Sequence, residues 1–95
     1  MDNLIGNLCI SLSGRDAGNE YLIYAHTGNN CFLVDGNAKK IINPKKKNIK
    51  HIKLLGVEST IIKEKIAKNQ KVFDSEIYSF IKNYKNCWNF YFSMI

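Results

Sequence analysis

The sequence lacks the long apolar run and the basic amino-terminal cluster that mark membrane and secreted proteins. Its most apolar stretch, residues 88–95, is less than half the roughly 20 residues that a membrane-spanning helix needs. Residues 1–6 carry an acid where a secretory signal carries basic residues. We therefore expect a protein without a membrane segment.

The cysteine and histidine patterns of metal and redox sites are also missing. Cys9, Cys31 and Cys87 are odd in number and far apart, with no Cys-x-x-Cys pair and no histidine at metal-ligand spacing. This usage favours a reducing compartment, and we expect a cytoplasmic protein without a metal or cofactor. Cys9 and Cys31 lie in apparent strands, where a reduced thiol behaves as a small hydrophobic side chain.

No set of residues with the pattern of a catalytic site is present. His26 and His51 stand apart in sequence, one beside a turn and one inside a basic segment. Gly14 and Gly18 join two apparent strands, whereas the glycines of a phosphate-binding loop join a strand to a helix. We expect no catalytic residues and no enzyme activity.

What the chain does contain is a succession of short strand signals. Its 95 residues, 45% hydrophobic and 23% charged, fit one small globular domain with one core. Short apolar or alternating runs separated by turn-forming residues lie at 8–12, 21–25, 31–34, 41–42 and 49–55. Five short strands with frequent turns predict a small antiparallel barrel or sandwich over residues 4–56.

Helical spacing replaces the strand pattern after Gly56, over residues 57–95. Ser59 or Thr60 caps a first predicted helix, and Asp74 or Ser75 caps a second. Apolar residues of the second helix form one stripe, namely Ile77, Phe80, Ile81, Tyr84 and Trp88. We expect this stripe to pack on the strands, because an isolated helix of this length is marginal in water. The predicted fold is mainly β with C-terminal helices.

The last eight residues are unusually apolar for a chain terminus. Trp88, Phe90 and Phe92 lie among them. Two interpretations remain open: the segment closes the bottom of a barrel, or it leaves an apolar patch that a protein partner covers.

Basic residues are concentrated in one segment. The chain has 14 Lys and Arg against 8 Asp and Glu, a net charge of +6, which favours contact with polyanions such as nucleic acid. The region from Lys39 to Lys53 contains no acid. Its basic residues are Lys39, Lys40, Lys45, Lys46, Lys47, Lys50, His51 and Lys53.

This segment predicts contacts with phosphates. Lysines that alternate along a strand share one solvent face and can meet successive phosphates, with little discrimination between base sequences. We therefore expect recognition of a structured RNA by its shape and backbone. The other interpretation is a solvated edge whose lysines prevent sheets from aggregating.

The two most distinctive stretches together resemble a known family. They are the segment Ser13-Gly14-Arg15-Asp16-Ala17-Gly18, followed by the strand at 21–24 and the turn Val34-Asp35-Gly36, and the basic segment 43–51. In order and spacing these pieces resemble the bacterial KOW-domain RNA-binding proteins, a small family related to eukaryotic-type large-subunit ribosomal proteins. The resemblance covers about residues 4–55 and implies an SH3-like barrel.

The resemblance also implies roles for the residues of the first loop. It makes this loop the RNA-facing part, with Gly14 and Gly18 shaping it, Arg15 contacting phosphate or base, and Asp16 orienting the arginine. Asn19 stands where the family often has a basic residue, so one expected contact is missing. The function expected is an RNA-binding accessory acting on ribosomal RNA in translation or ribosome assembly. The alternative is an SH3-like module that binds a protein through its aromatic C-terminal segment.

Overall fold

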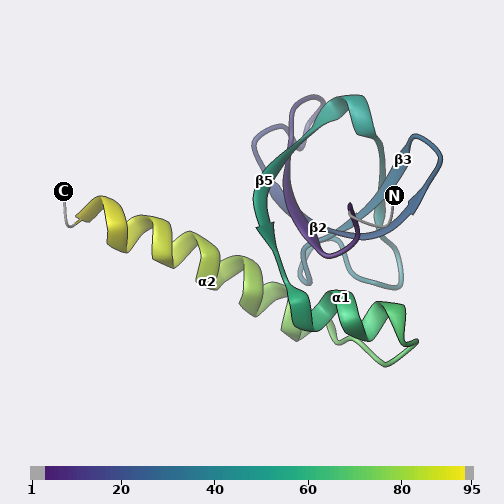
Figure 1. The fold of residues 1–95 in the computed structure, drawn as a ribbon. Helices are drawn as coiled ribbons and strands as arrows, with labels where there is room; N and C mark the ends of the chain where they lie inside the picture. Colours follow the sequence, from purple (N-terminus) through teal and green to yellow (C-terminus); the bar gives the residue numbers. More distant parts are fainter. Residues whose placement is uncertain (1–3, 94–95) are drawn as a thin grey trace.

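The computed structural model describes residues 4–93, and their side chains through residue 86. It shows a small, mostly β protein with a five-stranded antiparallel sheet and two α-helices, in agreement with the predicted class (Figure 1). The strands are β1 (Asn7–Ser11), β2 (Glu20–Thr27), β3 (Asn30–Val34), β4 (Lys45–Asn48) and β5 (Ile52–Glu58). The helices are the 3-10 turn η2 (Ile49–His51), α1 (Thr60–Ala67) and α2 (Asp74–Ser93).

The sheet has the strand order β4-β3-β2-β1-β5, so the first strand pairs with both the second and the last. In Figure 1 the strands curve around a common centre, and β5 returns beside β1. No backbone ladder joins β4 to β5 within the described residues, so the sheet is open between these two edges.

Apolar side chains cover both faces of the sheet. Leu8, Leu22 and Val34 are aligned across three strands and pack against helix residues such as Ile77. The opposite face carries a second buried cluster, formed by Cys9, Tyr21, Ile23, Cys31, Leu33 and Ile52, with Leu4 against it. We call this second cluster the inner cluster. Because both faces are buried, the central strands have apolar residues at consecutive positions.

Cys9 and Cys31 are fully buried free thiols, as predicted. Burial raises the pKa of both thiols, that of Cys9 to about 12, and the neighbouring Cys31 adds to the effect on Cys9. Both side chains therefore remain neutral and serve as small hydrophobic groups.

The predicted fourth and fifth strands are wrong in position. Residues 41–42 form a turn in which Ile42 is 92% exposed, and the fourth strand is instead the polar segment Lys45–Asn48. The strand forms there because its backbone pairs with β3, although none of its residues is apolar. The fifth strand begins only at Ile52, because the Asn48 side chain accepts a hydrogen bond from Lys50 N and caps the η2 turn.

Both predicted helices are present. The Ser59 side chain caps α1 by accepting a hydrogen bond from Ile62 N at 3.2 Å. On α2, Ile77 and Ile81 are buried, and the partly buried Phe80 and Tyr84 pack against the same core. The predicted stripe is thus confirmed for these four residues.

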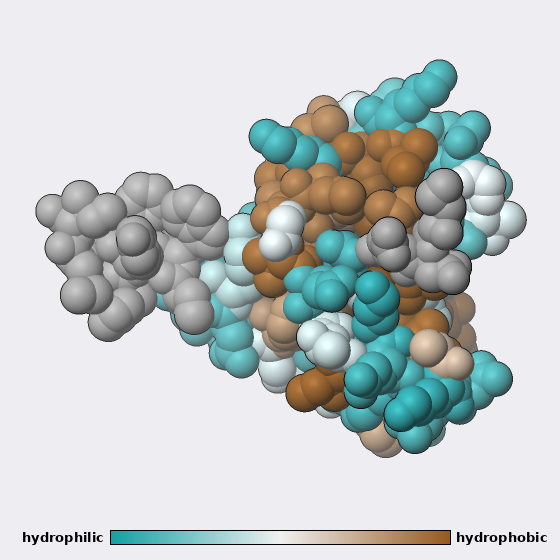
Figure 2. All heavy atoms as spheres, in the orientation of Figure 1, coloured by the Kyte–Doolittle hydropathy of each residue, from teal (hydrophilic) through white to brown (hydrophobic). Residues whose placement is uncertain are grey.

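The aromatic side chains proposed for a protein partner, those of Trp88, Phe90 and Phe92, lie outside the described residues. Figure 1 shows the last turns of α2 extending beyond the sheet. None of the helices described is long and apolar enough to cross a membrane. Figure 2 shows hydrophobic residues gathered over the strands on the face drawn, and hydrophilic residues over α1 and the segment after it.

The β3–β4 loop is fixed against the start of α2. Ile41 N donates to Asp74 Oδ1 at 2.8 Å, a link between residues far apart in sequence. Gly36 has a φ of +77°, and a Cβ added there would overlap the Asp74 carbonyl oxygen and lie 2.8 Å from Tyr78 N. Glycine is therefore required at this position both for backbone conformation and for space.

Candidate nucleic-acid interface

The loop between β1 and β2 presents Arg15 to solvent. Gly14 and Gly18 have φ values of +83° and +91°, which glycine adopts readily. Gly18 N donates to Ser11 O at 2.8 Å and closes the loop on the end of β1. Arg15 lies exposed between the two glycines, and it makes no hydrogen bond or ion pair with any residue in the range 4–86.

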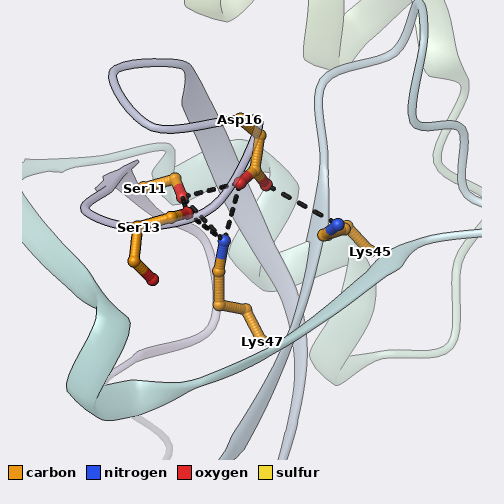
Figure 3. Close-up of polar contacts among 5 residues, drawn as sticks. All are labelled: Ser11, Ser13, Asp16, Lys45 and Lys47. Carbon is orange, nitrogen blue, oxygen red and sulfur yellow. Dashed lines mark hydrogen bonds and ion pairs between the residues drawn. The ribbon is translucent and has the colours of Figure 1, made fainter.

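Asp16 and Lys47 form a buried ion pair beneath this loop (Figure 3). Lys47 Nζ donates to Asp16 Oδ1 at 2.7 Å, to Ser13 O at 2.8 Å and to Ser11 Oγ at 2.9 Å. Ser11 Oγ in turn donates to Asp16 Oδ1 at 3.1 Å. These contacts use all three donors of the ammonium group, so Lys47 is fully committed within the protein.

The strand register explains why Lys47 points inward. Lys47 pairs with Cys31, and Lys45 pairs with Leu33. Cys31 and Leu33 belong to the inner cluster, so Lys45 and Lys47 lie on that side of the sheet. Lys46 faces the opposite way and is exposed.

This arrangement corrects two expectations from the sequence. Lys47, which we expected to contact phosphate, instead faces inward and bonds Asp16. Asp16 pairs with Lys47 and, at 4.0 Å, with Lys45, and within residues 4–86 no bond joins it to Arg15. The ion pair instead ties the first loop to β4, two elements that are not neighbours in the sheet.

The charged state of Asp16 is maintained by its partners. Burial disfavours the charge, but hydrogen bonds from Lys47 and Ser11 outweigh this effect and lower the pKa of the carboxyl below its ordinary value of 3.8. The other oxygen, Oδ2, is buried without a hydrogen-bond partner in the described part of the chain. The ammonium group of the half-exposed Lys45 lies 4.0 Å from this oxygen.

Acid should therefore weaken the fold through Asp16. Below about pH 4 the unfolded chain binds a proton on this carboxyl and the folded chain does not, so the free energy of unfolding falls as the pH falls toward the lowered pKa. Urea unfolding between pH 7 and pH 3 measures this dependence. The Asp16→Asn variant should show a shallower dependence over the same range, whereas equal slopes for the two proteins would contradict the assignment.

The remaining cations gather on adjacent elements. Leu12 N donates to His51 O at 2.8 Å, which places η2 beside the first loop. Lys53 follows at the start of β5, opposite Ile10. We call the resulting surface the basic face, formed by the exposed residues Arg15, Lys46, Lys50, His51 and Lys53.

Lys39 and Lys40 lie on a different element from the basic face. They belong to the β3–β4 loop, where Lys39 N donates to Asp35 Oδ1 at 2.8 Å and Lys39 O accepts from Asp35 N. Lys40 is exposed next to Ile41, which is bonded to α2. The structure does not join these two lysines to the loop that carries Arg15.

Sequence reasoning missed the buried serine of this site. Ser11 is 1% exposed and bonds both members of the ion pair. The sequence could have indicated its burial, because Ser11 lies two residues after Cys9 on one strand and residues i and i+2 share a face.

The described residues contain no cluster of His, Cys, Asp and Glu that could hold a metal ion. Comparison with protein-family models found no match, and a search of curated proteins found none either.

Proposed function

We propose that this protein is an accessory that binds structured RNA through the basic face, with ribosomal RNA as the expected target in translation or ribosome assembly. The observation that carries the proposal is the grouping of Arg15, Lys50 and Lys53 with Lys46 and His51, all exposed. No acid occurs between Lys39 and Val57, and Lys47 neutralises Asp16. Glu20, which lies opposite Ile10 on β2, is paired with Lys85. Such a surface attracts the phosphate backbone.

The proposal includes an SH3-like barrel. Support comes from β1, which pairs with both β2 and β5, and from the curvature of the strands around the inner cluster. The Lys47–Asp16 pair adds a side-chain link between β4 and the loop that follows β1. The first loop would then be held in a fixed position at one end of the barrel.

The positions of the lysines favour RNA binding over protection of a sheet edge. An edge-protecting role needs exposed lysines on the edge strand itself. On the edge strand β4, Lys47 is withdrawn into the ion pair and Lys45 lies toward Asp16, which leaves Lys46 as the outward-facing lysine. The other edge strand, β5, carries Lys53, so two of the five residues of the basic face lie on edges. Arg15 and Lys50 are on a loop and a 3-10 turn, where no edge needs protection.

Lysine recognises phosphate as a flexible point charge, so binding should depend on RNA shape and on salt more than on base sequence. With Arg15, Lys46, Lys50 and Lys53 each meeting one phosphate, a log–log plot of affinity against salt should have a slope of about −3. Fluorescence anisotropy with a labelled RNA hairpin, measured over a series of salt concentrations, tests this value. An affinity that does not change with salt would contradict the proposal.

A further inference from the structure

A pocket of about 470 Å³ lies between α2, the start of β2 and the β3–β4 loop. Pockets of this size hold small organic ligands. The pocket adjoins the first loop, because its lining residue Asn19 directly follows Gly18. A ligand here would therefore sit beside the segment that presents Arg15.

One wall of the pocket offers an aromatic surface. Tyr78 and the buried Ile81 lie nearly one turn apart on α2, and both line the pocket. The Tyr78 side chain is exposed enough to contact a ligand, at 43%. A planar ring beside an apolar floor suits the stacking of another planar ring.

A cation lies next to this ring. Lys82 Nζ lies over one face of the Tyr78 ring, 5.7 Å from its centroid, and forms no ion pair within residues 4–86. The other lysine of the lining, Lys85, is bound to Glu20 at 3.0 Å. Lys82 is thus the cation left to meet an anionic group of the ligand.

The loop opposite α2 supplies hydrogen-bonding groups in a fixed position. Asp35 Oδ1 accepts from Asn37 N at 2.9 Å and from Lys39 N at 2.8 Å, which holds this turn in place. The exposed Asn37 amide lines the pocket. An amide both donates and accepts hydrogen bonds, as the edge of a nucleobase requires.

We propose that this pocket binds one unpaired nucleotide of the RNA. The base stacks on the face of the Tyr78 ring that Lys82 does not cover, its edge meets the Asn37 amide, and the phosphate lies at Lys82. The ligand class rests on the function proposed above, since the pocket lies next to the loop of the basic face. The basic face supplies affinity for the backbone, and the pocket adds a preference for RNA with an unpaired base.

The test titrates the intact protein with each of the four nucleoside monophosphates of RNA and records the NMR spectrum of the protein at each step. The ring signals of Tyr78 and the side-chain amide of Asn37 should shift saturably. Tyr78→Ala should weaken binding about tenfold, whereas Tyr78→Phe should keep it, because stacking needs the ring and not the hydroxyl. Lys82→Gln should weaken binding of the monophosphate and leave binding of the corresponding nucleoside unchanged.

Absence of a saturable shift at Tyr78 up to the solubility limit of the nucleotides would overturn the proposal. Equal affinity of folded Tyr78→Ala and the unsubstituted protein would also overturn it. If Tyr78→Ala does not fold, the Lys82→Gln variant decides. An equal loss of affinity for the nucleoside and the monophosphate, or no loss for either, contradicts the assigned phosphate position. A blunt-ended RNA duplex has no unpaired base and tests the basic face separately. If the protein binds the duplex but not the nucleotides, the pocket proposal alone is refuted. If it binds the nucleotides but not the duplex, the basic-face proposal alone is refuted.

Discussion

Replacing Lys47 by methionine is expected to lower the free energy of unfolding by about 3 to 5 kcal/mol. The substitution leaves the Asp16 carboxylate buried beneath the first loop without its closest cation. It also removes the donors to Ser11 Oγ and Ser13 O. For a domain of this size, such a loss is a large part of the total stability.

Urea unfolding monitored by circular dichroism measures this loss of stability. The matched control is the Lys46→Met variant. Lys46 is the next residue on the same strand but is exposed, so its substitution should change the free energy of unfolding by less than about 0.5 kcal/mol. Adding Asp16→Asn to Lys47→Met should recover part of the loss, because no buried charge then remains. Equal stabilities of the Lys47→Met and Lys46→Met variants would contradict the buried ion pair.

Replacing Gly36 by alanine is expected to cost about 3 kcal/mol of stability. The backbone at this residue has a φ of +77°, and an added methyl group would overlap the Asp74 carbonyl oxygen at the start of α2. Both the loop and the helix would have to move apart, which would also stretch the bond from Ile41 N to Asp74.

Gly28→Ala is the control for backbone conformation alone. Gly28 has a φ of +59° with no atom within 4 Å of an added Cβ, so alanine there should cost about 1 kcal/mol. Thermal or urea unfolding of the two variants gives the comparison. A cost at Gly36 no larger than that at Gly28 would show that α2 does not pack against this loop as described.

Local sequence patterns could predict those elements in which the spacing of apolar residues and the turn or capping residues indicate the same structure. The alternation around Leu8 and Leu22, the serine cap of α1 and the stripe through Ile77 all indicated the elements that the structure contains. The fourth strand could not be found in this way. Its residues are three lysines and an asparagine, and only pairing with β3 makes them a strand.

The candidate site was predictable in location but not in the orientation of its residues. The basic segment and the first loop were identified from charge and glycine positions, and the structure brings parts of them together through η2. Whether each lysine faces out or in depends on strand register, which the sequence of β4 does not fix because it has no apolar side. For the same reason, the partner of Asp16 could not be inferred.

The most direct test of the central claim compares two triple variants that remove the same charge. Lys46→Gln, Lys50→Gln and Lys53→Gln together remove most of the basic face, while Lys63→Gln, Lys68→Gln and Lys71→Gln remove three lysines from α1 and the segment after it. Binding of a labelled ribosomal RNA hairpin is measured against salt for both. We predict that the first triple variant reduces the magnitude of the log–log slope by about 2 to 3 and the control leaves it nearly unchanged. Equal slopes for the two variants would contradict RNA binding by the basic face.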